Sequence, residues 1–215
     1  MSNKPFRIGT CKPCNRGLFQ MCNNEAVNGV TRDGGYGEYV TLRTEAVVRV
    51  PNHVDPAEYA PILCAGITVF NALRNQHIIP GDVVGVQGLG GLGHLALQYA
   101  NKMGYKVVAI SSSASKEKFA RDLGAHEYID GSKEDIGEAL QKMGGAACII
   151  VTAPNAKLIP GLISGLAPLG KLLLLAVAGP VEVNLAAMIQ KGLSIVAWPS
   201  GHALDSEEAI EYVSL

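Results

Sequence analysis

The feature that most constrains this chain is a glycine-rich segment, Gly88-Leu89-Gly90-Gly91-Leu92-Gly93. The residues before it, 82–87, form a short β-branched run of the kind that a buried parallel strand requires. After it, apolar residues recur every three or four positions from 92 to 103, which predicts a helix that ends at Gly104. The segment therefore predicts a tight strand-to-helix turn at the start of a β–α–β unit.

Strand and helix patterns alternate strictly after this turn. Ser132 with Asp135 resembles a capping box at one helix start, and Asp205 or Ser206 is expected to begin the last helix. We expect strands at 82–87, 106–110, 127–129, 147–151, 171–177 and 193–197, and helices at 92–103, 116–123, 132–143, 157–166 and 185–191. Six strands joined by helices predict an α/β fold built on a Rossmann-type doubly wound parallel sheet.

The chain before Pro80 has a different character. Residues 1–50 are rich in Gly, Asn and Cys, with two strand-like pieces at 37–42 and 46–50. The pattern becomes helical at 57–73, and a turn follows at Pro80-Gly81. We therefore expect a loop-rich N-terminal part, a doubly wound domain and a C-terminal helix, covering residues 1–79, 80–200 and 201–215.

The glycines have the spacing of a dinucleotide-binding turn. Gly88 would make the tight turn, Gly90 would let backbone N–H groups approach a pyrophosphate, and Gly93 would let the helix pack on the strand. The helix N-terminus would add partial positive charge toward the phosphates. The alternative is a glycine-rich turn without a ligand. The strand before and the helix after favour the dinucleotide.

Residues at the carboxyl ends of later strands are expected to face the same crevice. Val151 and Thr152 follow from this rule at one strand end, and Val177 follows from it at another. The alternative is that these side chains only pack.

The end of the second predicted strand bears on which dinucleotide binds. An acidic residue there would bind the ribose diol of NAD. This chain has Ser111, Ser112 and Ser113, then Lys116, and the next acid is Glu117. Hydroxyls and an ammonium favour the 2′-phosphate of NADP(H) over NAD. The alternative is a polar turn that caps the following helix.

Three of the five cysteines lie close together, as Cys11, Cys14 and Cys22. Their C-x2-C-x7-C spacing is typical of thiolates that share a tetrahedral Zn²⁺. Three ligands are one fewer than a structural zinc site uses, and the alternative is free thiols. The odd number and the crowding argue against a disulfide framework and favour a reducing compartment.

Bulk composition narrows the classes further. The chain has 215 residues, 48% of them hydrophobic, with 18 basic and 19 acidic residues and a formal charge of −1. Without a basic stripe, neither nucleic acid nor an anionic membrane is an expected partner. The longest apolar run, 172–178, is too short to span a bilayer, and residues 1–10 have no apolar signal core. We expect a soluble cytoplasmic protein.

Several motifs occur in the order found in one family. They are Cys11-Lys-Pro-Cys14-Asn-Arg-Gly17 through Cys22, then 34–39 (Gly-Gly-Tyr-Gly-Glu-Tyr), 60–68 (Ala-Pro-Ile-Leu-Cys-Ala-Gly-Ile-Thr), the segment 88–94 and the turn 198–201. In these motifs the chain, from about Gly9 onward, resembles the zinc-containing alcohol dehydrogenases of the medium-chain dehydrogenase/reductase family. It looks closest to microbial tetrameric members, while 110–113 is similar to NADP-using cinnamyl-type members.

The resemblance implies roles for the cysteines. The family's structural zinc uses four cysteines, as C-x2-C-x2-C-x7-C, and Cys11, Cys14 and Cys22 match the last three. The first falls at Ile8, which cannot bind a metal.

The family's catalytic zinc is bound by a Cys, a His and a third Cys or acid, and Cys64 matches the third ligand. Thr68 matches a position beside the nicotinamide. The alternatives are that Cys64 is a small buried hydrophobe and that Thr68 bonds the helix backbone.

The other two catalytic ligands would lie upstream of Cys11, where this chain has neither Cys nor His. The resemblance thus implies a chain truncated at both ends, in which 1–79 is a remnant of a β-rich GroES-like catalytic domain. It implies an oxidoreductase that transfers hydride between an alcohol or aldehyde and NAD(P) with the help of zinc, often as a homo-oligomer. The alternatives are a non-catalytic dinucleotide-binding protein and a zinc-independent NADPH reductase of the same superfamily, and the retained cysteines argue against the latter.

Overall fold

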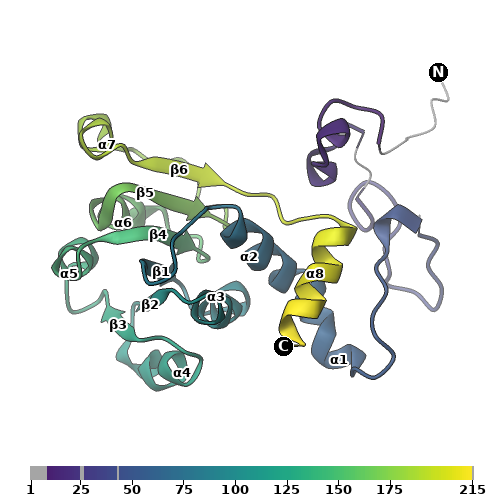
Figure 1. Ribbon diagram of the computed structural model, residues 1–215, viewed down its shortest axis with the longest axis horizontal. Coiled ribbons are helices and arrows are strands. Elements are labelled where there is room, and N and C mark those ends of the chain that lie inside the picture. The colour runs from purple at the N-terminus through teal and green to yellow at the C-terminus, as the bar shows by residue number, and fades with distance from the viewer. Residues whose placement is uncertain (1–8, 25–26, 43, 215) are drawn as a thin grey trace.

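The computed structural model describes residues 9–24, 27–42 and 44–214. Its centre is one sheet of six parallel strands in the order β3-β2-β1-β4-β5-β6 (Figure 1). The strands are β1 (Val83–Gln87), β2 (Lys106–Ser111), β3 (Glu127–Asp130), β4 (Ala146–Val151), β5 (Leu166–Leu174) and β6 (Ser194–Ala197). The order reverses direction between β1 and β4. The doubly wound parallel sheet predicted from the sequence is therefore confirmed.

Helices cover both faces of the sheet. The α-helices are α1 (Pro56–Tyr59), α2 (Ala65–Arg74), α3 (Gly91–Lys102), α4 (Glu117–Asp122), α5 (Ile136–Lys142), α6 (Ile159–Ser164), α7 (Leu185–Lys191) and α8 (Ala203–Val213). Short 3-10 turns are η1 (Cys14–Arg16), η2 (Phe19–Met21), η3 (Thr44–Ala46), η4 (Ala60–Leu63), η5 (Ala114–Lys116) and η6 (Ala156–Leu158). Helices α2, α3, α4 and α8 pack on one face, and α5 and α6 pack on the other.

Strand side chains alternate between two apolar cores. Val84, Val86 and Ile150 point into the core under α2 and α3, while Val108 and Ile149 point into the core under α5 and α6. All five are fully buried. This period of two, with both faces apolar, is what the β-branched runs predicted for a sheet covered on both sides.

Two helix starts differ from the expected ones. Asp135 rather than Ser132 caps α5, because its carboxylate accepts the Glu138 N–H at 2.8 Å. Helix α8 begins one turn earlier than expected, with His202 as its N-cap and Asp205 completing a capping box. Histidine is an uncommon cap, so the usual capping residues misled the prediction.

The strands expected at 37–42 and 46–50 are wrong. Within the described part of residues 9–79 the only ladder contact is an isolated bridge between Asn28 and Arg32. A strand needs a neighbour that completes its hydrogen bonds, and no described segment pairs with either piece. The described residues of the N-terminal part form turns and short helices instead.

Helix α2 does not stand apart from the sheet. Val69, Ala72 and Leu73 of α2 lie in the same core as Val84 of β1, and Ile210 of α8 joins them. In Figure 1, α8 lies between the sheet and the segments that precede α1. The domain boundary expected near residue 79 therefore coincides with a turn in the chain, but α2, which precedes it, packs in the same core as the sheet.

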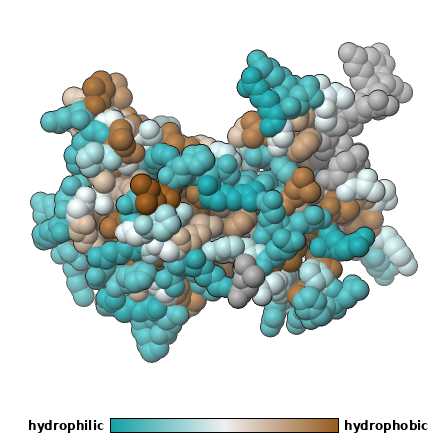
Figure 2. Space-filling model, in the orientation of Figure 1, coloured by the Kyte–Doolittle hydropathy of each residue, from teal (hydrophilic) through white to brown (hydrophobic). Residues whose placement is uncertain are grey.

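The surface carries both polar and apolar side chains. Figure 2 shows polar side chains over most of one face, with an apolar group at α7, where Ile189 is 82% exposed and Leu185 is 65% exposed. Among the described residues, no helix combines the length and the apolar character needed to cross a membrane.

Candidate functional site

The glycine segment 88–93 forms the turn from β1 into α3. Gly88 has a φ of +90°, and a β-carbon there would lie 2.7 Å from the Ala153 β-carbon. Gly90 is the N-cap of α3 and supplies no side-chain cap. A β-carbon on Gly90 or Gly91 would meet no atom within 4 Å. The turn is therefore closed toward the sheet and open above the helix N-terminus, as a cradle for a pyrophosphate must be.

Thr152, just after β4, ties this turn to the neighbouring strand. Its hydroxyl lies 2.8 Å from the carbonyl oxygen of Gln87 and 3.0 Å from that of Gly88. The Gln87 side chain in turn accepts the Ala153 N–H at 3.3 Å. Val151 is fully buried. Of the strand-end pair named from the sequence, Thr152 holds the turn and the Val151 side chain packs in the core.

A cavity of about 210 Å³ opens beside the turn, at the carboxyl ends of β1, β2, β3 and β4. Ser111, Ser112 and Lys116 line it, together with Gly88. Ser113 does not line it, because its hydroxyl accepts the Ser115 N–H at 3.2 Å and caps η5. Of the three serines expected at the cofactor, Ser111 and Ser112 thus line the cavity, and Ser113 caps a helical turn, as the alternative interpretation predicted.

A larger hollow of about 660 Å³ lies at the ends of β5 and β6. Its lining is mostly apolar: Leu174, Leu175, Ala176, Val177, Ala178, Gly179, Ala197, Trp198 and Pro199. Val177 lies beyond the end of β5 rather than inside the strand, since the strand stops at Leu174. The indole N–H of Trp198 is buried and has no hydrogen-bond partner among the described residues.

Cys64 and Thr68 lie at the start of α2. Cys64 separates η4 from α2 and is exposed, so it is not the buried hydrophobe that the alternative described. The Thr68 hydroxyl donates to the Cys64 carbonyl oxygen at 2.7 Å and lies 3.0 Å from the Ser200 hydroxyl. Within 9–24, 27–42 and 44–214, no group of three metal-ligating side chains includes Cys64.

The three clustered cysteines meet in what we call the cysteine lobe, residues 9–24. The sulfurs of Cys11, Cys14 and Cys22 all lie within 4.8 Å of one another, with Cys11 3.4 Å from Cys14 and 3.9 Å from Cys22. Four thiolates about 2.3 Å from a central Zn²⁺ are separated by about 3.8 Å along each tetrahedron edge. The cluster therefore fits a metal of that size. Position 8, the expected place of a fourth ligand, lies outside the described residues.

Backbone N–H groups point at two of these sulfurs. Hydrogen bonds from Cys14 and Asn23 lower the pKa of the Cys11 thiol to about 7. Burial raises the pKa of Cys22, whose sulfur accepts the Asn24 N–H at 3.4 Å. N–H donors around sulfur stabilise thiolate charge, which is the form that binds a metal. The lobe rests on the start of α8, where the Phe19 ring meets His202 edge-on at 5.1 Å between centroids.

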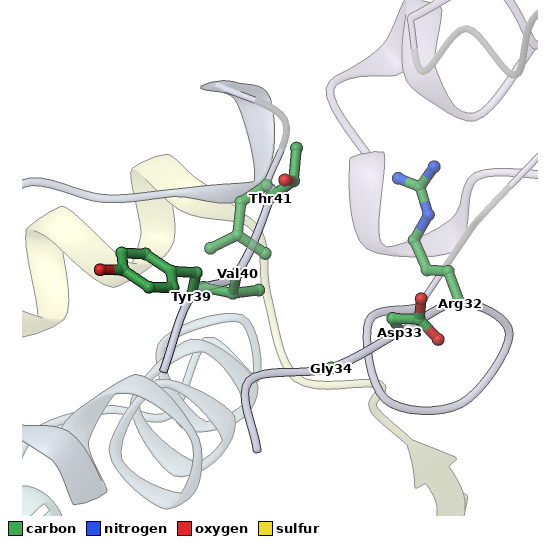
Figure 3. Close-up of a pocket in the computed structure, with 7 residues that line it drawn as sticks. Arg32, Asp33, Gly34, Tyr39, Val40 and Thr41 are labelled. Carbon is green, nitrogen blue, oxygen red and sulfur yellow. The ribbon is translucent and has the colours of Figure 1, made fainter. Parts of the chain in front are cut away.

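A hollow of about 460 Å³ lies away from these features, among the loops of residues 32–42. Arg32 and Asp33 lie on one side of it, and Tyr39, Val40 and Thr41 lie on the other (Figure 3). It contains none of the residues that the sequence predicted for the site.

Among the lining residues of the two cofactor-side cavities that sequence reasoning missed, three lie just beyond strand ends. Gly131 and Asn155 line the smaller cavity, and Trp198 lines the larger hollow. Each follows the carboxyl end of a strand by one to four residues. The strand-end rule that selected Thr152 at the end of β4 would have found them if it had also been applied to β3 and β6 and extended four residues past β4.

The sheet order, the glycine turn and the crevice at the strand ends define a Rossmann-type dehydrogenase fold. Residues 91–214 match a family model described as zinc-binding dehydrogenase. The alcohol dehydrogenase patD of Penicillium expansum is 59% identical over 207 residues, which cover 96% of this chain and 61% of that protein. The chain therefore belongs to the zinc-binding dehydrogenases.

Solved structures agree. The D-arabinose dehydrogenase of Sulfolobus solfataricus has a TM-score of 0.86 and 26% identity, over 95% of this chain and 66% of that one. A protein of Sinorhizobium meliloti 1021, assigned to the zinc-binding dehydrogenases and bound to NADP, has a TM-score of 0.83 and 25% identity, over 96% of this chain and 62% of that one. The chain spans about three fifths of the length of the curated relatives it matches.

Proposed function

We propose that this chain binds NADP(H) across the carboxyl edge of its sheet, as part of an alcohol dehydrogenase that interconverts an alcohol and an aldehyde. The observation that carries the proposal is the glycine turn, closed by Gly88 and Gly93 and open above Gly90. The pyrophosphate would lie on the N-terminus of α3, and the adenosine would enter the cavity of about 210 Å³. The nicotinamide would enter the apolar hollow beside Val177 and Trp198.

The preference for NADP(H) rests on the residues at the end of β2. Ser111 and Ser112 offer hydroxyls, and Lys116 offers an ammonium, around one cavity. No acidic side chain lines that cavity among the described residues. A 2′-phosphate would find donors there and no carboxylate to repel it.

For the reaction, we assign Cys64 as a zinc ligand and Thr68 as a residue beside the nicotinamide. When bound, zinc would lower the pKa of the alcohol oxygen and NADP⁺ would accept the hydride. Cys64 is exposed at the start of α2, where its sulfur can reach a metal, and Thr68 holds that turn through the Cys64 carbonyl. Two further ligands are needed, and no described residue supplies them. We therefore propose that the catalytic centre is incomplete in this chain.

We propose a second metal site in the cysteine lobe, held by Cys11, Cys14 and Cys22. The spacing of the sulfurs and the N–H donors around them support it. The site would stabilise a segment that has no apolar core of its own, since metal binding adds directly to folding free energy. The lobe and the rest of 1–79 would then belong to the catalytic domain, 80–200 would form the dinucleotide domain and 201–215 the C-terminal helix.

One alternative has a specific observation in its favour. The alternative is a protein that binds a dinucleotide without catalysis. It is favoured by Cys64, which has no partner ligands among the described residues. The zinc-independent reductase of the same superfamily is disfavoured, since it would have no use for a three-sulfur cluster of this geometry.

Three measurements on the purified chain test the proposal. Calorimetric titration with NADPH and NADH should show binding, with NADPH the tighter of the two. Zinc content near one per chain or above, without turnover, is expected for a dehydrogenase chain whose catalytic centre is incomplete. NADPH-dependent reduction of an aldehyde by this chain would refute that incompleteness, and dinucleotide binding without any bound zinc would favour the non-catalytic alternative. Absence of binding by both dinucleotides would refute the proposal for the glycine turn.

A further inference from the structure

The turn between β6 and α8 has a backbone that its sequence does not favour. Ser200 has a φ of +38°, in the left-handed region that favours glycine. A non-glycine residue keeps this conformation only where its surroundings hold it there. The turn begins at Trp198, which lines the apolar hollow and whose backbone N–H donates to the Leu174 carbonyl at 3.4 Å, so the conformation of the turn is one of the constraints on where the indole ring lies.

Asn71 of α2 holds this turn from 129 positions away in sequence. Its side-chain amide donates to the Ser200 carbonyl at 2.9 Å and to the Asp205 carboxylate at 3.2 Å. Its side-chain oxygen accepts from Arg74 at 2.9 Å and from Asn75 at 3.1 Å. Asn71 is only 2% exposed, and every polar atom of its side chain has a partner. A buried amide whose donors and acceptor are all used has one orientation available to it.

The neighbours of Asn71 complete a network between α2 and α8. Asp205 also accepts the His202 N–H at 2.9 Å and pairs with Arg74. Thr68, one turn before Asn71 on α2, has its hydroxyl 3.0 Å from that of Ser200. The same helix therefore carries Cys64 at its start and the residues that hold the Ser200 turn along one face.

We infer that Asn71 is a positioning residue: it holds Ser200 in the left-handed conformation and thereby places Trp198 as a wall of the hollow that receives the nicotinamide. This inference rests on the proposed function, which assigns that hollow to the nicotinamide half of the cofactor. Without Asn71 the turn populates other conformations. The apparent affinity for the dinucleotide then falls in proportion to the fraction of chains whose turn is correctly placed.

Trp198 reports on its own position, because it is the only tryptophan in the chain. Its emission overlaps the absorption of reduced nicotinamide, so NADPH bound in the hollow accepts energy from it. In the unmodified chain, NADPH binding should lower the fluorescence of Trp198. Excitation of Trp198 should then produce fluorescence from the bound NADPH. In Asn71→Leu, which fills similar space without hydrogen bonds, we expect about tenfold weaker NADPH binding and lower transfer at saturation.

Gln76→Leu is the matched control. Gln76 is a buried amide just after α2, and its side chain donates to the Ala72 carbonyl at 2.8 Å rather than to the turn. It should lower the melting temperature while leaving NADPH affinity and energy transfer unchanged. If Asn71→Leu does not fold, Asn71→Ser replaces it, since a serine is too short to reach Ser200 and Asp205 together.

A double variant tests the mechanism itself. Glycine takes a positive φ without steric cost, so Asn71→Leu with Ser200→Gly should bind NADPH more tightly than Asn71→Leu alone. Wild-type affinity and transfer in the folded Asn71 variant would overturn the inference, as would a double variant that binds no better. If the unmodified chain itself binds neither NADPH nor NADH, the proposed function has failed, and this result is distinct from the other two.

Discussion

A β-carbon on Gly93 would lie 1.8 Å from the carbonyl oxygen of Gly88. No side chain fits at that distance, so the first turn of α3 can press against the end of β1 only because position 93 is glycine. Gly90, three residues earlier, faces open space instead. The glycines of one loop therefore divide between two tasks: Gly93 allows helix and strand to pack closely, and Gly90 leaves the space in which we propose the pyrophosphate lies.

Replacing Gly93 by alanine should damage both fold and binding. We expect a loss of about 3 kcal/mol in the free energy of unfolding, since helix and strand must separate to admit the methyl group. Gly90→Ala should leave stability within about 0.5 kcal/mol and weaken NADPH binding, because its methyl would occupy the pyrophosphate cradle. Denaturant unfolding and calorimetry measure the two effects. Equal stability losses in both variants would contradict this division.

Thr152→Val should loosen the glycine turn. The hydroxyl bonds to the backbone at Gln87 and Gly88 are lost, which should cost about 1 kcal/mol of stability, since the half-buried Gly88 carbonyl loses this donor while the Gln87 carbonyl keeps the Thr152 N–H at 2.9 Å. Thr152→Ser keeps the hydroxyl and serves as the control. Chemical denaturation should rank the chains as wild type, then serine, then valine, and a valine variant as stable as the serine one would refute the role.

Lys116→Ala should shift cofactor preference. Removing an ammonium from the cavity beside Ser111 and Ser112 should weaken NADPH binding by about tenfold, the size of a charge-assisted hydrogen bond, and leave NADH binding nearly unchanged. The measurement is the ratio of the two dissociation constants by calorimetry. A fall in both affinities by the same factor would show that Lys116 acts on the fold or on the shared pyrophosphate instead.

Zinc in the cysteine lobe should depend on each clustered sulfur. Cys11→Ser or Cys22→Ser should reduce bound zinc by about one ion per chain after dialysis, since two thiolates hold the metal far less well than three. Cys148→Ala is the control, because Cys148 is buried in β4 away from the cluster. Elemental analysis measures the zinc bound per chain. Zinc retained at the wild-type level in the cluster variants would refute the proposed metal site.

Stability should fall at alkaline pH through Cys148. Burial raises the pKa of this thiol from 9.0 to about 12 in the folded chain. The unfolded chain loses the proton first, so the contribution is complete below pH 9 and is lost as the pH rises toward 12. Each unit above 9 costs about 1.4 kcal/mol from this group. Cys148→Ala should flatten the decline of unfolding free energy between pH 9 and 10.5, whereas the exposed Cys64→Ala should not.

The sheet was predictable because its signals are local. Residues such as Val84 and Ile149 lie in β-branched runs, and Gly104 ends its helix as expected. The segments 37–42 and 46–50 show the limit of such signals. They have the composition of strands, but a strand forms only where another segment pairs with it. Local composition does not indicate whether such a partner exists.

The residues of the candidate site likewise fall into those that a local signal predicts and those that it does not. Ser111, Ser112 and Lys116 were found because the strand-end rule places them by position alone. Ser113 obeyed a competing local preference for capping. Asn71 gave no signal, since its partners at Ser200 and Asp205 are set by how α2 and α8 pack. Contacts between distant segments are properties of the completed fold.

The contact between Phe19 and His202 joins nearly the two ends of the chain. Closing so large a loop is entropically unfavourable until the intervening sheet has formed, so this contact is expected to arise late in folding. The cysteine lobe would then stay undocked while β6 and α8 take shape. Its sulfurs would be accessible to metal, and to oxidants, for the whole of that interval. For the zinc site proposed in this lobe, the time that the lobe takes to dock therefore sets how long its thiols can bind zinc or be oxidised.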